Sequence, residues 1–206
     1  MKKKQVLLVF LILCFLSILI GIKIYPINPV DEAIYNTLFS IRNQFWDTFF
    51  SMITICGNTI TVIILVAISL FFLKKERYLL LIAVCTTVGM TQLFKCLVQR
   101  TRPDHIRLIV EKGYSFPSGH AMISISLYGF FLYFVYHNVK NKQLRWIFIS
   151  LLSILILGIG CSSVYLGVHY PSDILGGYCL SLFILLFLID KMPIFRGDKN
   201  DKNGSK

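Results

Sequence analysis

Charged residues are scarce in this chain of 206 residues: Asp, Glu, Lys and Arg together make up 15% of it, against 56% hydrophobic residues. A mean hydropathy of +0.71 is well above what the surface of a water-soluble globular protein tolerates. The composition therefore excludes a soluble domain. A helix needs roughly 20 apolar residues to cross about 30 Å of hydrocarbon, so the chain has room for several spans but not for a large soluble domain besides.

Acidic residues are the scarcer of the two charge types. The chain has 10 Asp and Glu against 21 Lys and Arg, a formal net charge of +11. In a soluble protein this excess would point to nucleic acid as a partner. In a membrane protein it reports instead which loops stay on the cytoplasmic side, so we expect no nucleic-acid partner.

Several motifs are missing. The six cysteines form no CxxC pair and no regular secreted framework, which predicts buried, inert thiols. The Lys2–Lys4 run precedes about 20 apolar residues with no small-x-small cleavage site after them, which predicts a retained first span rather than a signal peptide. His and carboxylate residues show no metal-ligand spacing, so we expect no metal and no cofactor.

Hydropathy predicts six spans, at about 5–24, 52–73, 78–97, 118–136, 146–166 and 173–190. The predicted fold class is therefore all-α, an integral membrane bundle of six transmembrane helices. Residues 1–196 would form one membrane domain. Residues 197–206 are polar and low in apolar side chains, so we expect a disordered cytoplasmic tail.

A second kind of helix is predicted between the first two spans. Ile34, Leu38, Ile41, Phe45 and Phe49 recur at steps of four, three, four and four residues, so they share one helix face. This pattern predicts an amphipathic helix that lies in the membrane interface. The alternative is that the stretch extends the second span into the bundle.

Basic residues predict the topology. Four basic segments stand out, and six spans place them all on one side: residues 2–4, 74–77, 140–145 and 191–206. Both termini of this multi-pass protein of the cell membrane are then expected in the cytoplasm. The connection between the third and fourth spans breaks the rule, because it carries five cations on the opposite side: Lys95, Arg100, Arg102, Arg107 and Lys112. Either the topology is inverted or these cations serve an anion outside.

Two short segments near that connection have the residue types of a phosphate site. Lys95 begins a run that ends in Arg102-Pro103, although Lys95 alone would suit a lysine that snorkels to the interface. Pro117-Ser118-Gly119-His120 directly precedes the fourth span. Ser is a favoured N-cap, and a helix N-terminus presents free N–H groups that bind phosphate oxygens. The alternative is simple helix capping.

A third segment lies between the fifth and sixth spans. Asp173 follows His169 by four residues, near the expected start of the last span. A carboxylate there can accept a hydrogen bond from one imidazole nitrogen and leave the other free to attack. Ionisable residues inside a membrane are costly, which favours a functional interpretation. His105 and His137 have no such neighbours, and we expect both in loops.

These segments resemble the signature of the type 2 phosphatidic acid phosphatases, membrane lipid phosphate phosphatases related to vanadium haloperoxidases. The family pattern is KxxxxxxRP, then PSGH, then SRxxxxxHxxxD. Here it reads Lys95 to Arg102-Pro103, then Pro117 to His120, then Ser162 with His169 and Asp173. Order and spacing both fit, over about 80 residues.

The resemblance implies a role for each matched residue. His169 would be the nucleophile that forms a phosphohistidine, with Asp173 fixing its tautomer. His120 would be the general acid. Lys95, Arg102, Ser118 and the Gly119 N–H would bind the phosphate oxygens. The scheme needs no metal and no cofactor.

One position departs from the family pattern, since Ser163 stands where the family carries Arg. A serine hydroxyl cannot replace the bidentate bonds of a guanidinium. By analogy with one oxyanion donor, such a loss costs roughly 100- to 1,000-fold in rate. We put forward Arg100 and Arg107 as the candidates to compensate.

The expected substrate is a lipid phosphate, because a phosphate pocket at the lipid–water boundary can bind a headgroup whose chains stay in the bilayer. For bacterial relatives the family suggests phosphatidylglycerophosphate, phosphatidic acid or undecaprenyl diphosphate, with the active site on the extracytoplasmic face. The alternatives are a lipid phosphotransferase, a catalytically weak lipid-phosphate binding protein, and a structural protein whose cations hold headgroups. We expect no obligate protein partner.

Overall fold

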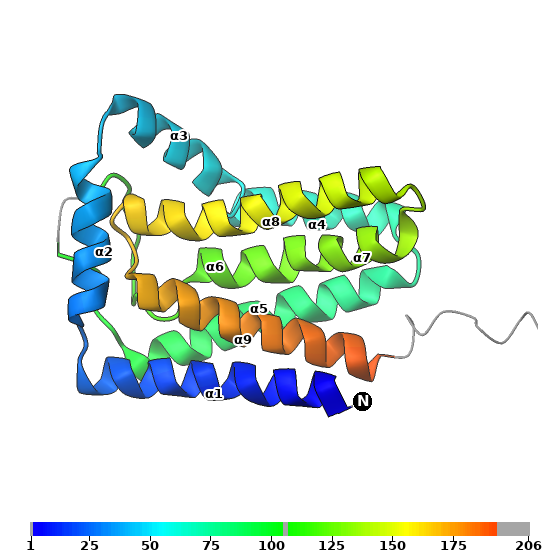
Figure 1. Cartoon of the computed structure of the whole chain (residues 1–206), viewed down its shortest axis with the longest axis horizontal. Helices are drawn as coiled ribbons and strands as arrows, with labels where there is room; N and C mark the ends of the chain where they lie inside the picture. Colours follow the sequence, from blue (N-terminus) through cyan, green and yellow to red (C-terminus); the bar gives the residue numbers. More distant parts are fainter. Residues whose placement is uncertain (1, 105–106, 193–206) are drawn as a thin grey trace, which may run out of the picture.

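The computed structural model describes residues 2–104 and 107–192, and within them the chain is helical and contains no strand. The predicted loop residue His105 and the predicted tail 197–206 lie outside the described residues. The helices, shown in Figure 1, are α1 (Lys2–Ile24), α2 (Pro29–Ser40), α3 (Gln44–Ile55), α4 (Thr59–Phe72), α5 (Glu76–Val98), α6 (Gly119–Ser124), α7 (Phe130–Asn138), α8 (Lys142–Tyr165) and α9 (Pro171–Lys191). A short π-helix, η1 (Ile125–Gly129), joins α6 to α7.

Five stretches are long and apolar enough to cross a membrane: α1, α5, the run Gly119–Asn138, α8 and α9. A sixth is reached only if α3 and α4 together count as one span. The all-α membrane bundle is therefore confirmed, and the number of six spans stays a prediction.

The predicted second span, 52–73, is broken. It consists of the end of α3 and all of α4, which are bent by 42° relative to each other. Asn58 causes the break locally, because its side chain accepts a hydrogen bond from Thr61 N at 2.9 Å and so caps a new helix. Gly57 fits at the bend because a Cβ there would lie 2.8 Å from Ile159 Cγ2.

The single amphipathic helix predicted through residues 34–49 is wrong as one element. Its apolar period runs on, but the helix stops at Ser40 and a new one begins at Gln44. Asn43 again supplies the cap, accepting from Trp46 N at 3.1 Å. In Figure 1, α2 lies across one end of the bundle. Whether it lies in the membrane interface stays a prediction.

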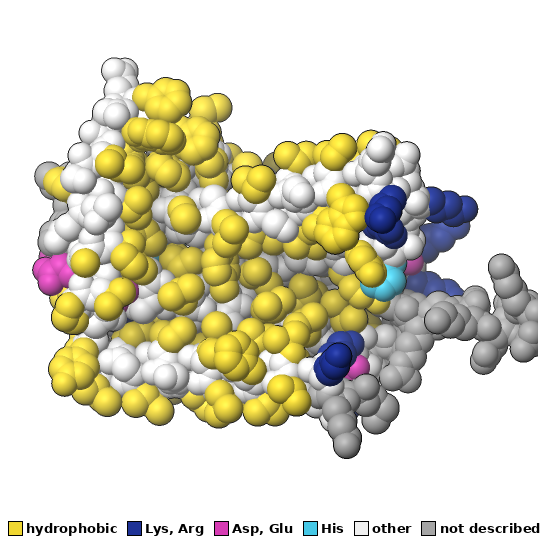
Figure 2. Space-filling model, in the orientation of Figure 1, with side chains coloured by type: hydrophobic (Ala, Val, Ile, Leu, Met, Phe, Trp, Pro, Cys, Tyr) yellow, Lys and Arg dark blue, Asp and Glu magenta, His cyan; other side chains and the backbone are white. Residues whose placement is uncertain are grey.

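Helices α1 and α4 to α9 run side by side, with the start of α1 and the end of α9 at the same end of the bundle (Figure 1). Lys4 Nζ donates to Asp190 Oδ1 there, at 3.2 Å. Figure 2 shows Lys and Arg gathered at this end and a hydrophobic surface along the bundle. This end is opposite the one that α2 covers.

The six cysteines are all free, as predicted, but the prediction that they are buried is wrong. Cys85, Cys96 and Cys161 are exposed and the other three are intermediate. An apolar segment predicts burial only in water, whereas the apolar spans of a membrane bundle also present side chains to lipid.

Helices α8 and α9 approach closely at Gly160. A Cβ at this position would lie 2.7 Å from Ile174 Cγ2 and 2.9 Å from Tyr178 Cζ. The Tyr178 hydroxyl lies there because it donates to Ile156 O at 2.5 Å. Only glycine fits without moving one helix.

We therefore expect Gly160→Ala to lower the thermal unfolding temperature in detergent, with a cost of about 1–3 kcal/mol for overpacking. The matched control is Gly89→Ala in α5, where a Cβ would meet nothing within 4 Å. The control should keep or raise the unfolding temperature, because Ala favours helix over Gly by about 1 kcal/mol. Equal unfolding temperatures for the two variants would contradict the close approach.

Candidate active site

The first motif leaves the end of α5. Gln99 adopts a left-handed conformation with φ 52°, and its N–H caps the helix by donating to Lys95 O at 3.0 Å. This turn ends α5 and sends the chain across the end of the bundle. Lys95, one turn before the end of α5, stays on the helix and faces a cavity.

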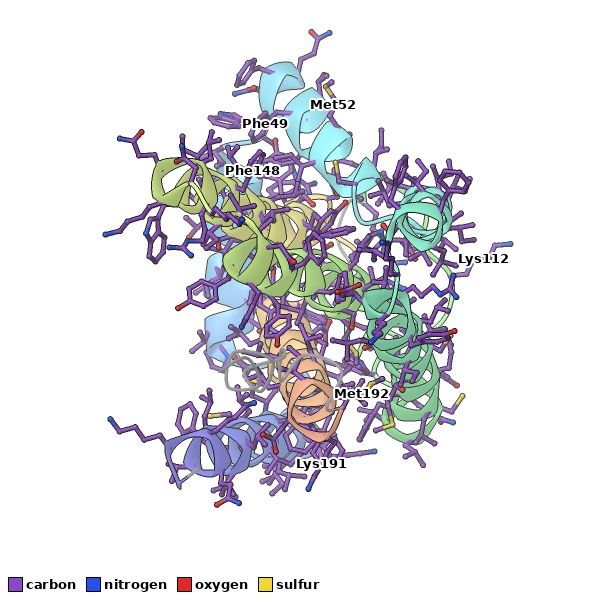
Figure 3. All side chains as sticks on the ribbon, turned by 90° about the vertical axis from the view of Figure 1, so that its right-hand side faces the viewer. Phe49, Met52, Lys112, Phe148, Lys191 and Met192 are labelled. Carbon is purple, nitrogen blue, oxygen red and sulfur yellow. The ribbon has the colours of Figure 1, made fainter. Side chains whose placement is uncertain are left out.

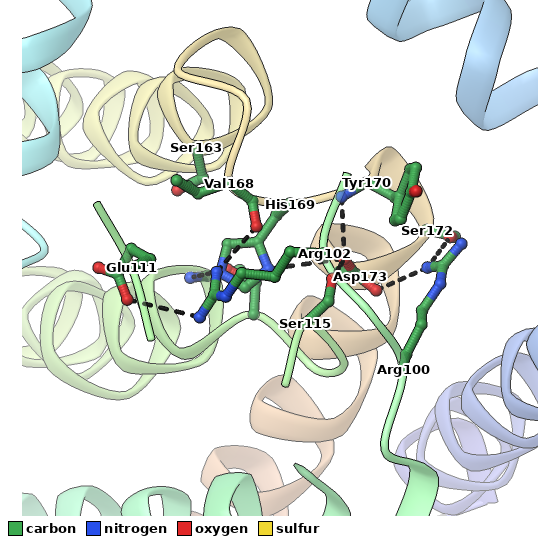
Figure 4. Close-up of polar contacts among 12 residues, drawn as sticks. Arg100, Arg102, Glu111, Ser115, Ser163, Val168, His169, Tyr170, Ser172 and Asp173 are labelled. Atoms are coloured by element: carbon green, nitrogen blue, oxygen red, sulfur yellow. Dashed lines mark hydrogen bonds and ion pairs between the residues drawn. The ribbon is translucent and has the colours of Figure 1, made fainter. Parts of the chain in front are cut away.

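Arg102 is buried, and backbone oxygens hold its guanidinium in place (Figure 4). Nε donates to Gly113 O at 3.0 Å, Nη1 to Val168 O at 2.8 Å and Nη2 to Lys112 O at 3.2 Å. The acceptors belong to the loop after α5 and to the loop after α8. The bonds therefore fix the guanidinium where the first motif meets the third.

The contact between Arg102 and His169 identifies the tautomer of the imidazole. Nη1 lies 3.3 Å from His169 Nε2. A guanidinium can only donate, so Nε2 must be the acceptor and the proton must sit on Nδ1. Nδ1 faces Asp173 Oδ2 at 3.5 Å, a separation that is long for a hydrogen bond. Catalytic contacts of this kind often shorten only when substrate binds.

The backbone around His169 is held by the end of α8. Ser163 O accepts from Val168 N at 3.2 Å and from His169 N at 3.3 Å, while Gly167 takes a positive φ of 79° to allow the turn. The Ser163 hydroxyl donates to Ile159 O at 3.0 Å. Ser163 therefore supports His169 through its backbone, and its hydroxyl faces its own helix.

The second motif sits on the first turns of α9. Ser118 caps the run Gly119–Asn138, since its Oγ accepts from Ala121 N at 3.3 Å, and its own N–H donates to Asp173 O at 3.2 Å. Gly177 allows this approach, because a Cβ there would lie 3.2 Å from Ser118 O. Ser118 is completely buried, whereas the next two residues reach the cavity.

The three motifs meet at one cavity of about 670 Å³. Its polar end is lined by Lys95, Glu111, Lys112, Gly119, His120 and His169, and its apolar wall includes Val62, Ile63, Val84 and Val88. Figure 3 shows Lys112 at the edge of the bundle, beside α4 and α5. Of the predicted site residues, four line the cavity directly. The other three, Arg102, Ser118 and Asp173, contact or adjoin them.

Glu111 and Lys112 are cavity residues that the motifs did not identify. The excess of cations between the third and fourth spans was the available signal for Lys112. Glu111 accepts from Arg102 Nη2 at 3.4 Å. It therefore pairs with one donor edge of the Arg102 guanidinium.

The candidates proposed to compensate for Ser163 do not line the cavity. Arg100 donates to Asp173 Oδ1 at 2.6 Å and to Asp31 Oδ2 at 2.8 Å, with its side chain 1% exposed. Arg107 donates to Pro103 O at 2.9 Å. For Arg100 the idea is wrong, because all three of its nitrogens already donate within the protein, to Pro26 O and to the carboxylates of Asp31 and Asp173.

The charge state of His169 follows from its burial. Burial lowers the pKa of His169 to about 4, against the opposing effect of the Asp173 carboxylate. The imidazole is therefore neutral at physiological pH. Among the residues described, no group of three or more His, Cys, Asp or Glu is placed to hold a metal ion. Metal independence stays a prediction that needs an activity measurement.

The family model of the PAP2 superfamily matches residues 76–195 of this chain. The chain belongs to the PAP2 superfamily. All three motifs lie within the part matched by the PAP2 model, from Lys95 to Asp173. The family predicted from the motifs is thereby confirmed, although the roles of the individual residues are not tested by this match.

Two known proteins similar to this PAP2 chain are lipid phosphatases by name. Phosphatidylglycerophosphatase B of Bacillus subtilis (strain 168) is 32% identical over 201 residues, which cover 91% of this chain and 97% of the relative. Lipid A 4'-phosphatase of Porphyromonas gingivalis is 26% identical over 176 residues, covering 77% and 71%. The crystal structure of a transmembrane PAP2 type phosphatidylglycerolphosphate phosphatase from Bacillus subtilis matches with a TM-score of 0.81 at 30% identity, covering 89% of this chain and 94% of that one.

The lowered pKa of His169 in this PAP2 site predicts a stability change with pH. The folded-state pKa of about 4 lies below the ordinary value of 6.5, so only the unfolded chain takes up this proton between them. The contribution to stability is present above about pH 6.5 and is lost as the pH falls toward about 4. We expect His169→Gln to weaken this loss, measured as thermal unfolding temperature against pH. Parallel curves for the variant and the wild type would contradict a neutral buried His169.

Proposed function

We propose that this chain hydrolyses the terminal phosphomonoester of phosphatidylglycerophosphate and releases inorganic phosphate. The chain is a membrane lipid phosphatase by its family, by its helical bundle and by the phosphatases that resemble it. The observation that carries the proposal is the cavity, which joins a cationic end containing two histidines to an apolar wall formed by α4 and α5.

The choice among lipid phosphates rests on two features. One similar protein and one solved structure, which align with 91% and 89% of this chain, are named for phosphatidylglycerophosphate. The polar end of the cavity also holds two lysines, Lys95 and Lys112. A headgroup with a phosphomonoester and a phosphodiester carries two anionic groups, and phosphatidic acid carries only one. Two cations therefore favour a headgroup with two phosphates over phosphatidic acid, and the names of the relatives favour phosphatidylglycerophosphate over undecaprenyl diphosphate.

The first chemical step is a displacement at phosphorus by His169. The proton sits on Nδ1, so Nε2 carries the lone pair, which Arg102 Nη1 contacts in the resting site. When Arg102 turns to a phosphoryl oxygen, this lone pair attacks and forms an N–P bond. The bond between phosphorus and the glycerol oxygen breaks, and its electron pair goes to that oxygen. His120, which lines the same cavity, donates the proton that yields the free hydroxyl of the lipid. Asp173 stabilises the positive charge that develops on the His169 ring.

The second step returns the enzyme to its starting state. Water attacks the phosphohistidine, His120 accepts its proton, and the N–P bond breaks to release phosphate. During both steps the phosphoryl oxygens carry negative charge that the site must stabilise. Lys95, Arg102 and the Gly119 N–H would do so, and Ser118 holds the helix start that presents Gly119.

The orientation in the membrane is part of the proposal. The basic end of the bundle in Figure 2 would face the cytoplasm by the positive-inside rule. The cavity would then open on the extracytoplasmic side, with both termini in the cytoplasm. In the connection between α5 and α6, Arg102 and Lys112 would serve the substrate, and Arg100 is neutralised by buried carboxylates, so these cations do not contradict this orientation.

Phosphate release from phosphatidylglycerophosphate tests the activity and its nucleophile. We expect release by the purified protein in detergent with a chelator present, and a fall of at least about 1,000-fold in His169→Ala because no intermediate forms. His120→Asn should lose about 100- to 10,000-fold as general acid–base catalysis is removed. His137→Ala is the control, since His137 is exposed in the last turn of α7, and should match the wild type.

The same assay compares phosphatidic acid and undecaprenyl diphosphate, for which we expect a lower kcat/KM. A higher kcat/KM with either lipid would overturn the substrate assignment alone. Release that persists in His169→Ala, or that disappears with chelator, would overturn the mechanism.

The apolar wall predicts that substrate chains lie along α5. Val88 lines the cavity and is 49% exposed. We expect Val88→Trp to raise KM for long-chain phosphatidylglycerophosphate about tenfold, by filling space that a chain needs, and to leave the hydrolysis of a short-chain soluble phosphate ester unchanged. Leu93→Trp is a matched control, because Leu93 on the same helix is also 49% exposed but does not line the cavity. An equal effect of both variants would contradict the proposed location of the chains.

A further inference from the structure

A buried row of charges connects α2 to the start of α9. Asp31 on α2, Arg100 on the loop after α5 and Asp173 on α9 have side chains that are 2%, 1% and 0% exposed. Arg100 bridges the two carboxylates, donating through Nη2 to Asp31 and through Nη1 to Asp173, as Figure 4 shows for Asp173. None of the three lines the cavity, so substrate does not explain them.

The oxygens of each carboxylate in this row accept several hydrogen bonds. Asp31 Oδ1 accepts from Ser172 N at 2.8 Å, and its Oδ2 accepts from Ser172 Oγ at 2.5 Å and from Asn28 Nδ2 at 2.8 Å. Asp31 therefore also holds the first turn of α9, one residue before Asp173.

Asp173 divides its two oxygens between different partners. Oδ2 faces His169 and accepts from the Ser115 hydroxyl and from Tyr170 N at 2.8 Å. Oδ1 accepts from Arg100 alone among the described residues. The guanidinium also stacks over the Tyr170 ring, 4.2 Å from Cζ to the ring centroid. The orientation of Asp173 toward His169 thus depends on where Arg100 is held.

The charges in this row match the needs of the proposed reaction. Two carboxylates and one guanidinium sum to −1, and the imidazolium that forms when His169 attacks brings the sum to zero. Without Asp31 the row would sum to zero before attack and to +1 afterwards. Charges interact strongly where water is excluded, so Asp31 favours the charged state of His169 without touching it.

We propose that Asp31 is a positioning residue for His169 that acts through Arg100 and Asp173. The inference rests on the proposed function, because it takes His169 as the nucleophile. It gives α2 a role in the chemistry: the helix delivers a second carboxylate that orients Arg100 and offsets its charge.

The test is the hydrolysis of phosphatidylglycerophosphate by Asp31→Asn, with rates divided by the amount of folded, monodisperse protein. We expect kcat to fall roughly 10- to 100-fold and KM to stay within about twofold, since the phosphate contacts remain. Asp190→Asn makes the same atomic change at the other end of the bundle, where Asp190 pairs with Lys4, and should match the wild type in kcat and KM.

A second measurement separates positioning from a general loss of structure. In an Asp173→Asn background, Asp31→Asn should lower kcat by no more than about threefold, because its route to His169 is already broken. Ser172→Ala removes a hydroxyl from the row and keeps every charge, so its kcat should fall less than that of Asp31→Asn.

The other possible outcomes would overturn either the positioning role of Asp31 or the proposed function. Unchanged kcat in Asp31→Asn, a rise in KM alone, or losses that multiply in the double variant would overturn the positioning role while His169→Ala still supports the proposed function. A wild type that releases no phosphate from phosphatidylglycerophosphate, phosphatidic acid or undecaprenyl diphosphate would overturn the proposed function, and the positioning role with it.

Discussion

The buried ion pair between Arg100 and Asp173 is the interaction on which the rest of the site depends. A carboxylate without exposed surface costs several kcal/mol to bury unless it is paired and hydrogen-bonded. Asp173 meets that cost with Arg100, the Ser115 hydroxyl and Tyr170 N. Arg100 and Ser115 come from the connection between α5 and α6, and Tyr170 comes from the connection between α8 and α9. Satisfying one charge therefore brings the ends of α5, α8 and α9 together. The cavity and its two histidines lie where those ends meet.

The sequence predicted those site residues that lie in short motifs with a fixed spacing along the chain. Lys95, His120 and His169 lie in short motifs, and residue type and spacing sufficed to place them at one end of the bundle. Asp31 and Arg100 gave no such signal. They are 69 residues apart. Two opposite charges so far apart in sequence form no repeating pattern from which their contact could be predicted. Arg100 was predicted to compensate for Ser163 at the phosphate, because charge alone does not tell a phosphate from a carboxylate as its partner.

The fold was predictable where a property extends over many residues. Helices α1, α5, α8 and α9 agree with the hydropathic spans to within a few residues, because each is a long apolar run. The breaks before α3 and α4 were missed. Each depends on one residue, Asn43 or Asn58, whose side chain caps the next helix, and a window of about 19 residues averages such a residue away.

The cavity has walls of opposite character, with Lys112 at its polar end and the lipid-facing Val88 on its apolar side. Under the proposed reaction the two products prefer different solvents. The dephosphorylated lipid returns sideways into the bilayer, whereas phosphate escapes into water. In that reaction the lipid is freed in the first step and phosphate only after water attacks the phosphohistidine. The lipid can therefore diffuse into the bilayer while the phosphoryl group is still on His169.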